Sequence, residues 1–170
     1  DGIVLDWQSW EGELWGQKTF DKRRFSNPTS IIQKLHDLDV YFMISIWPNM
    51  SRESDNFKEM DKFKCNLPQS EIYDAYRQEA RDLYWKQAKQ GLFAHGVDAW
   101  WCDSSEPFTP EWNEQVRPEP DQNYLAFHKI VSQYTDPQYS NAYALFHAQG
   151  IYEGQRSETV DKRVVNLTRS

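Results

Sequence analysis

The 170-residue sequence lacks any apolar run that approaches the length of about 18 residues needed to span a bilayer. Hydrophobic residues make up only 39% of the chain, which favours a soluble globular protein. Positive charge is also scarce, because 19 Lys and Arg face 26 Asp and Glu and leave a net charge of −7 at pH 7. No basic patch is therefore expected to displace phosphate counterions. We expect neither nucleic acid nor a membrane as a partner.

Cysteine and histidine are too scattered to predict a metal site or a disulfide framework. The two cysteines, Cys65 and Cys102, form no CxxC pair and are not spaced as metal ligands. No HExxH-like pair occurs among the four histidines, which we expect to be packed or surface side chains: His36, His95, His128 and His147. No glycine-rich turn follows an apolar segment, which disfavours Rossmann-type and P-loop phosphate binding. We expect no metal and no cofactor.

The two ends of the sequence predict a piece of a longer protein. Asp1 leads directly into the apolar run Ile3-Val4-Leu5, with no initiator Met and no targeting segment. The last residues, 164–170, resemble a strand that has just finished, whereas natural domains more often end in a docked helix or a polar tail. The sequence therefore does not determine the cellular compartment of the protein, although it favours the cytoplasm.

Apolar segments typical of buried strands alternate with segments of helical periodicity. Four strands are predicted, at residues 2–6, 40–47, 97–103 and 163–168. Helices are predicted from Pro28 onward after the N-cap Asn27, over about 70–90 with Ser70 as N-cap, and over 122–134 and 140–152. A long polar loop is predicted at 49–69. Repeated βα units of this kind predict an α/β fold with a parallel sheet.

Polar and aromatic side chains stand at the carboxyl end of every predicted strand. Asp6 ends the first strand, Trp47 the second and Asp103 the third, and Arg169 follows the fourth. In parallel α/β sheets, and in eight-stranded βα barrels, ligands bind at these ends. The pattern therefore predicts one shared pocket. Taken singly, however, Asp6 could cap a loop, Trp47 could be ordinary core, and Arg169 could be solvated.

Asp103 is the hardest of these residues to explain by structure alone. An apolar strand delivers its carboxylate, and a second carboxylate, Glu106, follows three positions later. An ion pair with Arg117 or Arg169 is the structural alternative. Carboxylates bordered by Trp suit sugar chemistry, because indole faces stack on a pyranose while carboxylates accept its hydroxyl hydrogen bonds or attack the anomeric carbon. The acidic net charge is compatible with a neutral substrate.

The segment Trp100-Trp101-Cys102-Asp103-Ser104-Ser105-Glu106-Pro107 resembles the W-x-D-x-x-E-P nucleophile motif of glycoside hydrolase family 31. The resemblance covers nearly the whole chain, since residues 3–7, 20–28, 43–48, 147–156 and 167–170 are similar to other segments of the family's barrel. The tripeptide Asp6-Trp7-Gln8 and residues 149–156 are most similar to bacterial α-xylosidase-type members.

These enzymes are retaining α-glycosidases with a (β/α)8 TIM barrel. The resemblance thus implies that residues 1–170 are the central part of one catalytic barrel domain, about four βα units of eight, truncated at both ends.

Carried over by position, the resemblance implies that Asp103 is the catalytic nucleophile. The subsite for the non-reducing sugar would then be lined by Asp6, Trp47, Trp101 and Arg169, with Glu106 as a supporting or hydroxyl-binding carboxylate. The family's acid/base is an Asp in a W-x-G-D motif, which this sequence does not contain. Glu106 lies too close to Asp103 along the same loop to reach the opposite side of the scissile bond. We therefore expect the 170-residue chain alone to be inactive.

The expected parent enzyme hydrolyses α-xylosides or related α-glycosides, including oligosaccharides. Two alternatives stay open: a non-catalytic carbohydrate-binding fragment, and an α-glucosidase-like or α-galactosidase-like barrel. Half a barrel would leave two unpaired sheet edges and an apolar inner face exposed. We therefore also expect the chain to self-associate.

Overall fold

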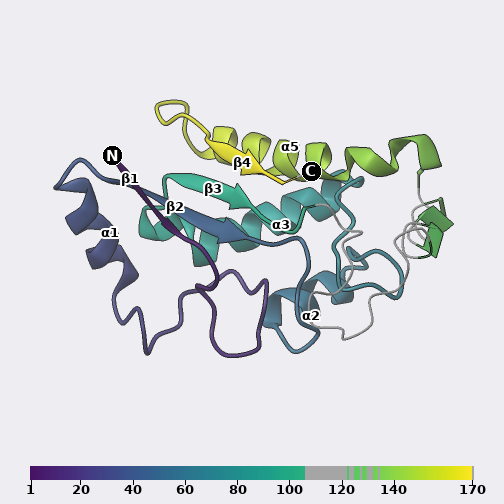
Figure 1. Cartoon of the computed structure of the whole chain (residues 1–170), viewed down its shortest axis with the longest axis horizontal. Helices are drawn as coiled ribbons and strands as arrows, with labels where there is room; N and C mark the ends of the chain where they lie inside the picture. Colours follow the sequence, from purple (N-terminus) through teal and green to yellow (C-terminus); the bar gives the residue numbers. More distant parts are fainter. Residues whose placement is uncertain (106–121, 123–124, 127, 130–131, 134, 170) are drawn as a thin grey trace.

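The four predicted strands form one parallel sheet in the order β1-β2-β3-β4. The computed structural model describes residues 1–105, 122, 125–126, 128–129, 132–133 and 135–169. The strands are β1 (Gly2–Leu5), β2 (Tyr41–Ile46), β3 (Ala99–Cys102) and β4 (Asn166–Thr168). Each lies inside its predicted range, and their arrowheads point the same way in Figure 1. The predicted α/β fold with a parallel sheet is confirmed.

One face of the sheet is covered by helices. The helix α1 (Pro28–His36) starts where predicted, with the Asn27 side chain accepting from the Ser30 N–H at 3.0 Å. The longer helices α3 (Gln78–Gly91) and α5 (Tyr143–Glu158) pack against each other, and α5 also packs on β4 (Figure 1). Alternate strand residues point toward these helices and are buried: Phe42, Ile44, Ile46, Trp100 and Cys102.

Two of the predicted helical boundaries and one predicted loop are wrong. The predicted loop at 49–69 contains the helix α2 (Asp55–Lys62), whose N-cap Ser54 accepts from the Phe57 N–H. Ser70 does not cap a helix, because α3 begins only at Gln78 and the segment before it forms isolated bridges, pairing Ile72 with Asn49. The last helix begins at Tyr143, after the short 3-10 helix Pro137–Ala142, and continues to Glu158. A second 3-10 helix spans Phe93–His95.

The predicted helix at 122–134 falls mostly outside the described residues. Among the helices that the structure does describe, none is both long enough and apolar enough to cross a membrane.

The other face of the sheet is apolar and exposed. Val4, Tyr41, Val165 and Leu167 alternate with the helix-facing residues and are 44%, 66%, 47% and 50% exposed. A hollow of about 630 Å³ opens at the amino ends of the strands on this face, with Val4, Tyr41 and Val165 in its lining. None of the predicted site residues lines this hollow, because they stand at the opposite, carboxyl ends.

Candidate active site

The sheet register brings three of the predicted site residues into one row. Ile46 is in register with Cys102, and Cys102 with Thr168, so the residues that follow them, Trp47, Asp103 and Arg169, leave the sheet side by side. The Asp103 N–H donates to the Ile46 carbonyl at 3.1 Å, and the Arg169 N–H donates to the Cys102 carbonyl at 3.3 Å. These bonds continue the strand pairing through the site, so its backbone is held by the sheet.

The Asp103 carboxylate is held by one of its two oxygens. Oδ1 accepts from the Ser104 N–H at 2.8 Å and from the Arg169 guanidinium (Nη1) at 3.1 Å. The ion pair with Arg169 that the sequence allowed is therefore present. The side chain of Asp103 is 16% exposed, and Oδ2 makes no hydrogen bond within the described part of the chain. Among the residues that the structure describes, one oxygen is thus fixed by hydrogen bonds and the other has no partner.

Ser105 ties the ends of β3 and β4 together beneath this carboxylate. Its side chain is fully buried, and its Oγ lies at hydrogen-bond distance from the Cys102 carbonyl (2.8 Å) and from the Arg169 carbonyl. Sequence reasoning missed this residue, although a small hydroxyl side chain two positions after a strand-end carboxylate was a usable signal. Its partner Arg169 lies 64 positions away, which no local pattern reveals.

A cluster of three indoles stands beside the row, at the carboxyl ends of β1 and β2. The ring centroids lie 5.3 Å apart for Trp7 and Trp10, 5.0 Å for Trp7 and Trp47, and 5.4 Å for Trp10 and Trp47. Trp10 is buried, Trp47 is half-buried and Trp7 is 60% exposed. The Tyr84 hydroxyl donates to the Trp47 carbonyl at 2.8 Å. Trp47 therefore belongs partly to the core, and Trp7 and Trp10 extend its apolar surface.

The remaining predicted site residues fall into two groups. Asp6 and Trp101 are on the same face of the sheet as Asp103 by strand alternation, with Asp6 exposed and Trp101 half-buried. Glu106, together with the alternative ion-pair partner Arg117, lies outside the described residues. The structure therefore brings together five of the six predicted positions at one edge of one face.

Beneath Trp47 lies a buried polar group that the sequence did not predict. The ammonium of Lys18 contacts Met50 Sδ and Gln87 Oε1, both at 3.2 Å, and lies 3.9 Å from the Tyr84 ring centroid. Burial lowers the pKa of Lys18 to about 7, although the charge of Glu59 acts in the opposite direction.

His147 occupies the same interior as a packed histidine, as predicted. Its Nδ1 lies 2.7 Å from the Tyr73 hydroxyl, and Tyr73 stacks on Tyr84 at 4.4 Å. Burial, and secondarily the charge of Lys18, lowers the pKa of His147 to about 3. The imidazole is therefore neutral across the physiological range. Within the described ranges, no group of three His, Cys, Asp or Glu side chains is arranged to hold a metal ion.

Comparison with known proteins decides the family. A family model for the "Glycosyl hydrolases family 31 TIM-barrel domain" matches residues 1–170. The chain belongs to glycoside hydrolase family 31. This family 31 chain is 35% identical to an α-xylosidase of Saccharolobus solfataricus over 170 residues. The resemblance seen in the sequence is thereby confirmed, and so is the assignment of the sheet to part of a TIM barrel.

Solved structures of family 31 members match the chain in fold. The α-xylosidase of Xanthomonas citri superimposes with a TM-score of 0.79 at 30% identity, over 98% of this chain. An α-xylosidase from a soil metagenome, solved with xylose, gives a TM-score of 0.72 at 23% identity over 97% of this chain. The family 31 chain spans only 22% of the Saccharolobus protein, 19% of the Xanthomonas chain and 25% of the metagenome chain.

Proposed function

We propose that this chain carries the nucleophile of a retaining α-glycoside hydrolase that acts on α-xylosides. The observation that carries the proposal is the Asp103 carboxylate, whose Oδ1 is fixed by Arg169 and Ser104 while Oδ2 is available. The α-xylosidases among its relatives support xylose as the glycon. Family membership supports a sugar substrate in general.

In the proposed reaction Asp103 acts first as a nucleophile. Oδ2 attacks the anomeric carbon, the bond to the leaving oxygen breaks, and a β-linked glycosyl ester forms on the enzyme. Water then attacks the same carbon and releases Asp103 as a carboxylate, giving net retention. Arg169 holds the carboxylate in place through their ion pair, and the half-buried Trp47 and Trp101 offer apolar faces to the sugar ring. Asp6 is proposed to accept hydrogen bonds from glycon hydroxyls, and Glu106 to support the site.

The chain alone is proposed to lack turnover. A retaining glycosidase needs a second carboxylate about 5–5.5 Å from the first to protonate the leaving oxygen. The W-x-G-D motif that carries this group in the family is absent from the sequence. Because the chain spans less than a quarter of the α-xylosidase of Saccharolobus, we place the activity in a longer protein of which residues 1–170 form the central part of the barrel.

The proposal is tested by measuring hydrolysis of an aryl α-xyloside by the full-length protein and by the 170-residue chain. We expect turnover by the full-length protein, with retention of configuration in the first-formed sugar, and none by the chain. Asp103→Asn should reduce kcat by about three orders of magnitude or more, since covalent catalysis is lost.

Two outcomes would contradict parts of the proposal. Turnover by the isolated chain would show that the acid is within residues 1–170. Sugar binding without turnover by the full-length protein would favour the non-catalytic alternative, and a preference for aryl α-glucoside or α-galactoside would change the glycon.

A further inference from the structure

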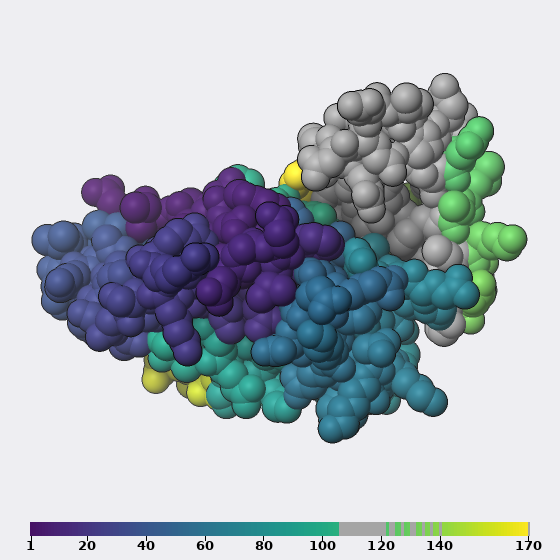
Figure 2. Space-filling model, turned by 90° about the horizontal axis from the view of Figure 1, so that it is seen from below, coloured from purple at the N-terminus to yellow at the C-terminus, as the bar shows by residue number. Residues whose placement is uncertain are grey.

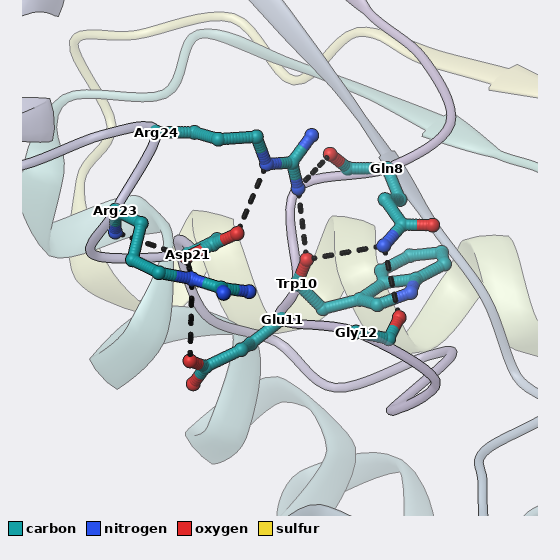
Figure 3. A network of polar contacts seen from close by, with 7 residues as sticks. All are labelled: Gln8, Trp10, Glu11, Gly12, Asp21, Arg23 and Arg24. Carbon is teal, nitrogen blue, oxygen red and sulfur yellow. Dashed lines mark hydrogen bonds and ion pairs between the residues drawn. The ribbon is translucent and has the colours of Figure 1, made fainter.

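The segment after β1 is held through the carbonyls of three consecutive residues, all bonded to Asp21 or Arg24. Figure 3 shows the two bonds that Arg24 makes. The Arg24 guanidinium (Nη2) donates to the carbonyls of Gln8 and Trp10, each at 2.8 Å. The carbonyl between them, of Ser9, accepts from the Asp21 N–H at 2.8 Å. Asp21 and Arg24 therefore hold the backbone from Gln8 to Trp10, and the Gln8 side chain adds a longer bond to the Trp10 carbonyl at 3.4 Å.

Arg24 is itself oriented by a buried carboxylate. Its Nε donates to Asp21 Oδ2 at 3.1 Å, while Asp21 Oδ1 accepts from the Arg23 N–H at 2.9 Å. The Asp21 residue is only 4% exposed. The Arg23 N–H, followed by the Arg24 side chain, lowers the pKa of Asp21, so this carboxylate stays ionised. A planar guanidinium can face a carboxylate with Nε and two carbonyls with Nη2 at once, an arrangement that a lysine ammonium does not reproduce.

The indole nitrogens of the buried Trp10 and the half-buried Trp47 add no hydrogen bonds that would fix them within the described residues. Packing, ring contacts among the three indoles and the backbone bonds therefore position Trp7 and Trp10. Trp47 has a backbone anchor of its own in the Tyr84 hydroxyl, which is independent of Arg24.

We infer that Arg24 is a positioning residue for the sugar site, which sets the indole wall formed by Trp7, Trp10 and Trp47 through the carbonyls of Gln8 and Trp10. This inference rests on the proposed function, since it assumes that the accessible part of the wall, Trp7 and Trp47, contacts the substrate while the buried Trp10 supports it. Arg24 contacts neither Asp103 nor Arg169 in the described structure, so it acts on binding and leaves the chemical step alone.

The test compares Arg24→Lys and Arg24→Ala with Arg23→Lys in the full-length enzyme. Arg23 is a matched control, because its side chain is 75% exposed and its N–H to Asp21 survives substitution. We expect Arg24→Ala to raise KM for an aryl α-xyloside about tenfold while kcat changes less than threefold. This pattern indicates the loss of an interaction that stabilises the bound substrate and the transition state equally. Arg24→Lys should raise KM nearly as much, and Arg23→Lys should leave both constants unchanged.

A second readout separates positioning from mere stability. Because the Arg24 side chain is 43% exposed, millimolar guanidinium ion should enter the site in Arg24→Ala and lower its KM toward the parent value, whereas methylammonium should not. A lowered melting temperature with unchanged KM in both Arg24 variants would overturn the inference, and so would equal rescue by both cations. If Arg24→Ala does not fold, Arg24→Lys alone tests the inference: a raised KM supports it, and an unchanged KM overturns it.

Failure of the proposed function is visible separately. An Asp103→Asn variant that keeps full activity overturns the nucleophile assignment, while the KM of the Arg24 variants still decides the role of Arg24. A full-length protein without any glycosidase activity overturns both.

Discussion

At the scale of single residues, the buried ammonium of Lys18 is an uncommon feature with an energetic cost. The side chain is 2% exposed, and its polar contacts are neutral: a thioether, an amide oxygen and an aromatic face. Burial of a charge without a directly paired carboxylate disfavours the protonated form, which explains the lowered pKa.

The pH dependence of stability should reveal this buried charge. The pKa of Lys18 falls from 10.5 in the unfolded chain to about 7 in the folded one, so between these values the unfolded state binds the extra proton. Stability therefore gains a favourable contribution as pH rises above 7, and the full penalty applies below it. Lys18→Met removes this pH-dependent contribution to the free energy of unfolding. From pH 7 to pH 9 the free energy of unfolding of the parent should rise by roughly 2 kcal/mol relative to Lys18→Met.

Urea unfolding at several pH values measures the difference. The exposed Lys22 provides a control, since Lys22→Met should follow the pH dependence of the parent. If the free energies of unfolding of Lys18→Met and the parent differ by the same amount from pH 6 to pH 9, folding does not lower the pKa of Lys18.

Site residues at strand ends could be predicted from sequence, whereas their supports could not. Asp103 and Trp47 follow apolar strands, and parallel strands place such residues at one edge. The partners of Lys18, by contrast, lie 32 and 69 positions away, at Met50 and Gln87. No local periodicity encodes contacts at those separations, so a buried lysine in a loop could not be distinguished from a solvated one.

At the scale of elements, the packing of α3 against α5 depends on a glycine in the second helix. A Cβ built on Gly154 would lie 2.2 Å from Trp85 Cγ and 2.4 Å from its Cδ2, on a ring that is only 5% exposed. The two helices can approach closely only because this position has no side chain.

Gly154→Ala should therefore destabilise the chain, against the usual helix preference. Alanine in a helix is normally favoured over glycine by about 1 kcal/mol, but overpacking against a rigid ring costs about 1–3 kcal/mol. We expect a net loss in urea unfolding, and a smaller loss when Gly154→Ala is combined with Trp85→Leu, which makes room for the methyl group. Leu145→Ala, at a 67% exposed position of the same helix, is the control and should change stability little. A stabilised Gly154→Ala variant would contradict the close packing of the two helices.

The errors in the predicted elements have separate physical causes. In α2 only Phe57 and Met60 are buried, so a charged sequence around two apolar residues was taken for a loop. The helical spacing of Ile72 and Tyr76 with later residues suggested an early start for α3, but Ile72 pairs instead with Asn49 of the preceding segment. In α2 the apolar signal was too sparse, and at Ile72 tertiary pairing outweighed local periodicity. The four strands lie inside their predicted ranges.

At the scale of the whole molecule, the chain presents contrasting surfaces. Seen from below in Figure 2, the purple segment after β1 lies beside the blue segment after β2. Hydrogen bonds join these segments, including one from the Ser51 N–H to the Trp15 carbonyl and one from the Lys18 N–H to Asn56 Oδ1. The uncovered face of the sheet, in contrast, exposes Val4 and Tyr41 to solvent. Contiguous apolar surface of this kind favours association.

The isolated 170-residue chain should therefore self-associate. Light scattering after gel filtration is expected to give a mass above the 20.3 kDa of one chain. The double variant Tyr41→Lys with Leu167→Lys places charges on the apolar face and should shift the population to monomer. Leu145→Lys, a change at an equally exposed leucine of α5, should not. A monodisperse monomer of the unmodified chain would contradict the prediction that the exposed apolar face drives self-association.

The identity of the nucleophile is tested most directly by trapping the glycosyl ester in the full-length enzyme. A fluorinated α-xylosyl fluoride with a good leaving group should accumulate the intermediate, and peptide mapping by mass spectrometry should locate one xylosyl-derived label. We predict the label on Asp103, and its loss in Asp103→Asn. A label on another carboxylate, or stoichiometric inactivation that persists in Asp103→Asn, would contradict the assignment.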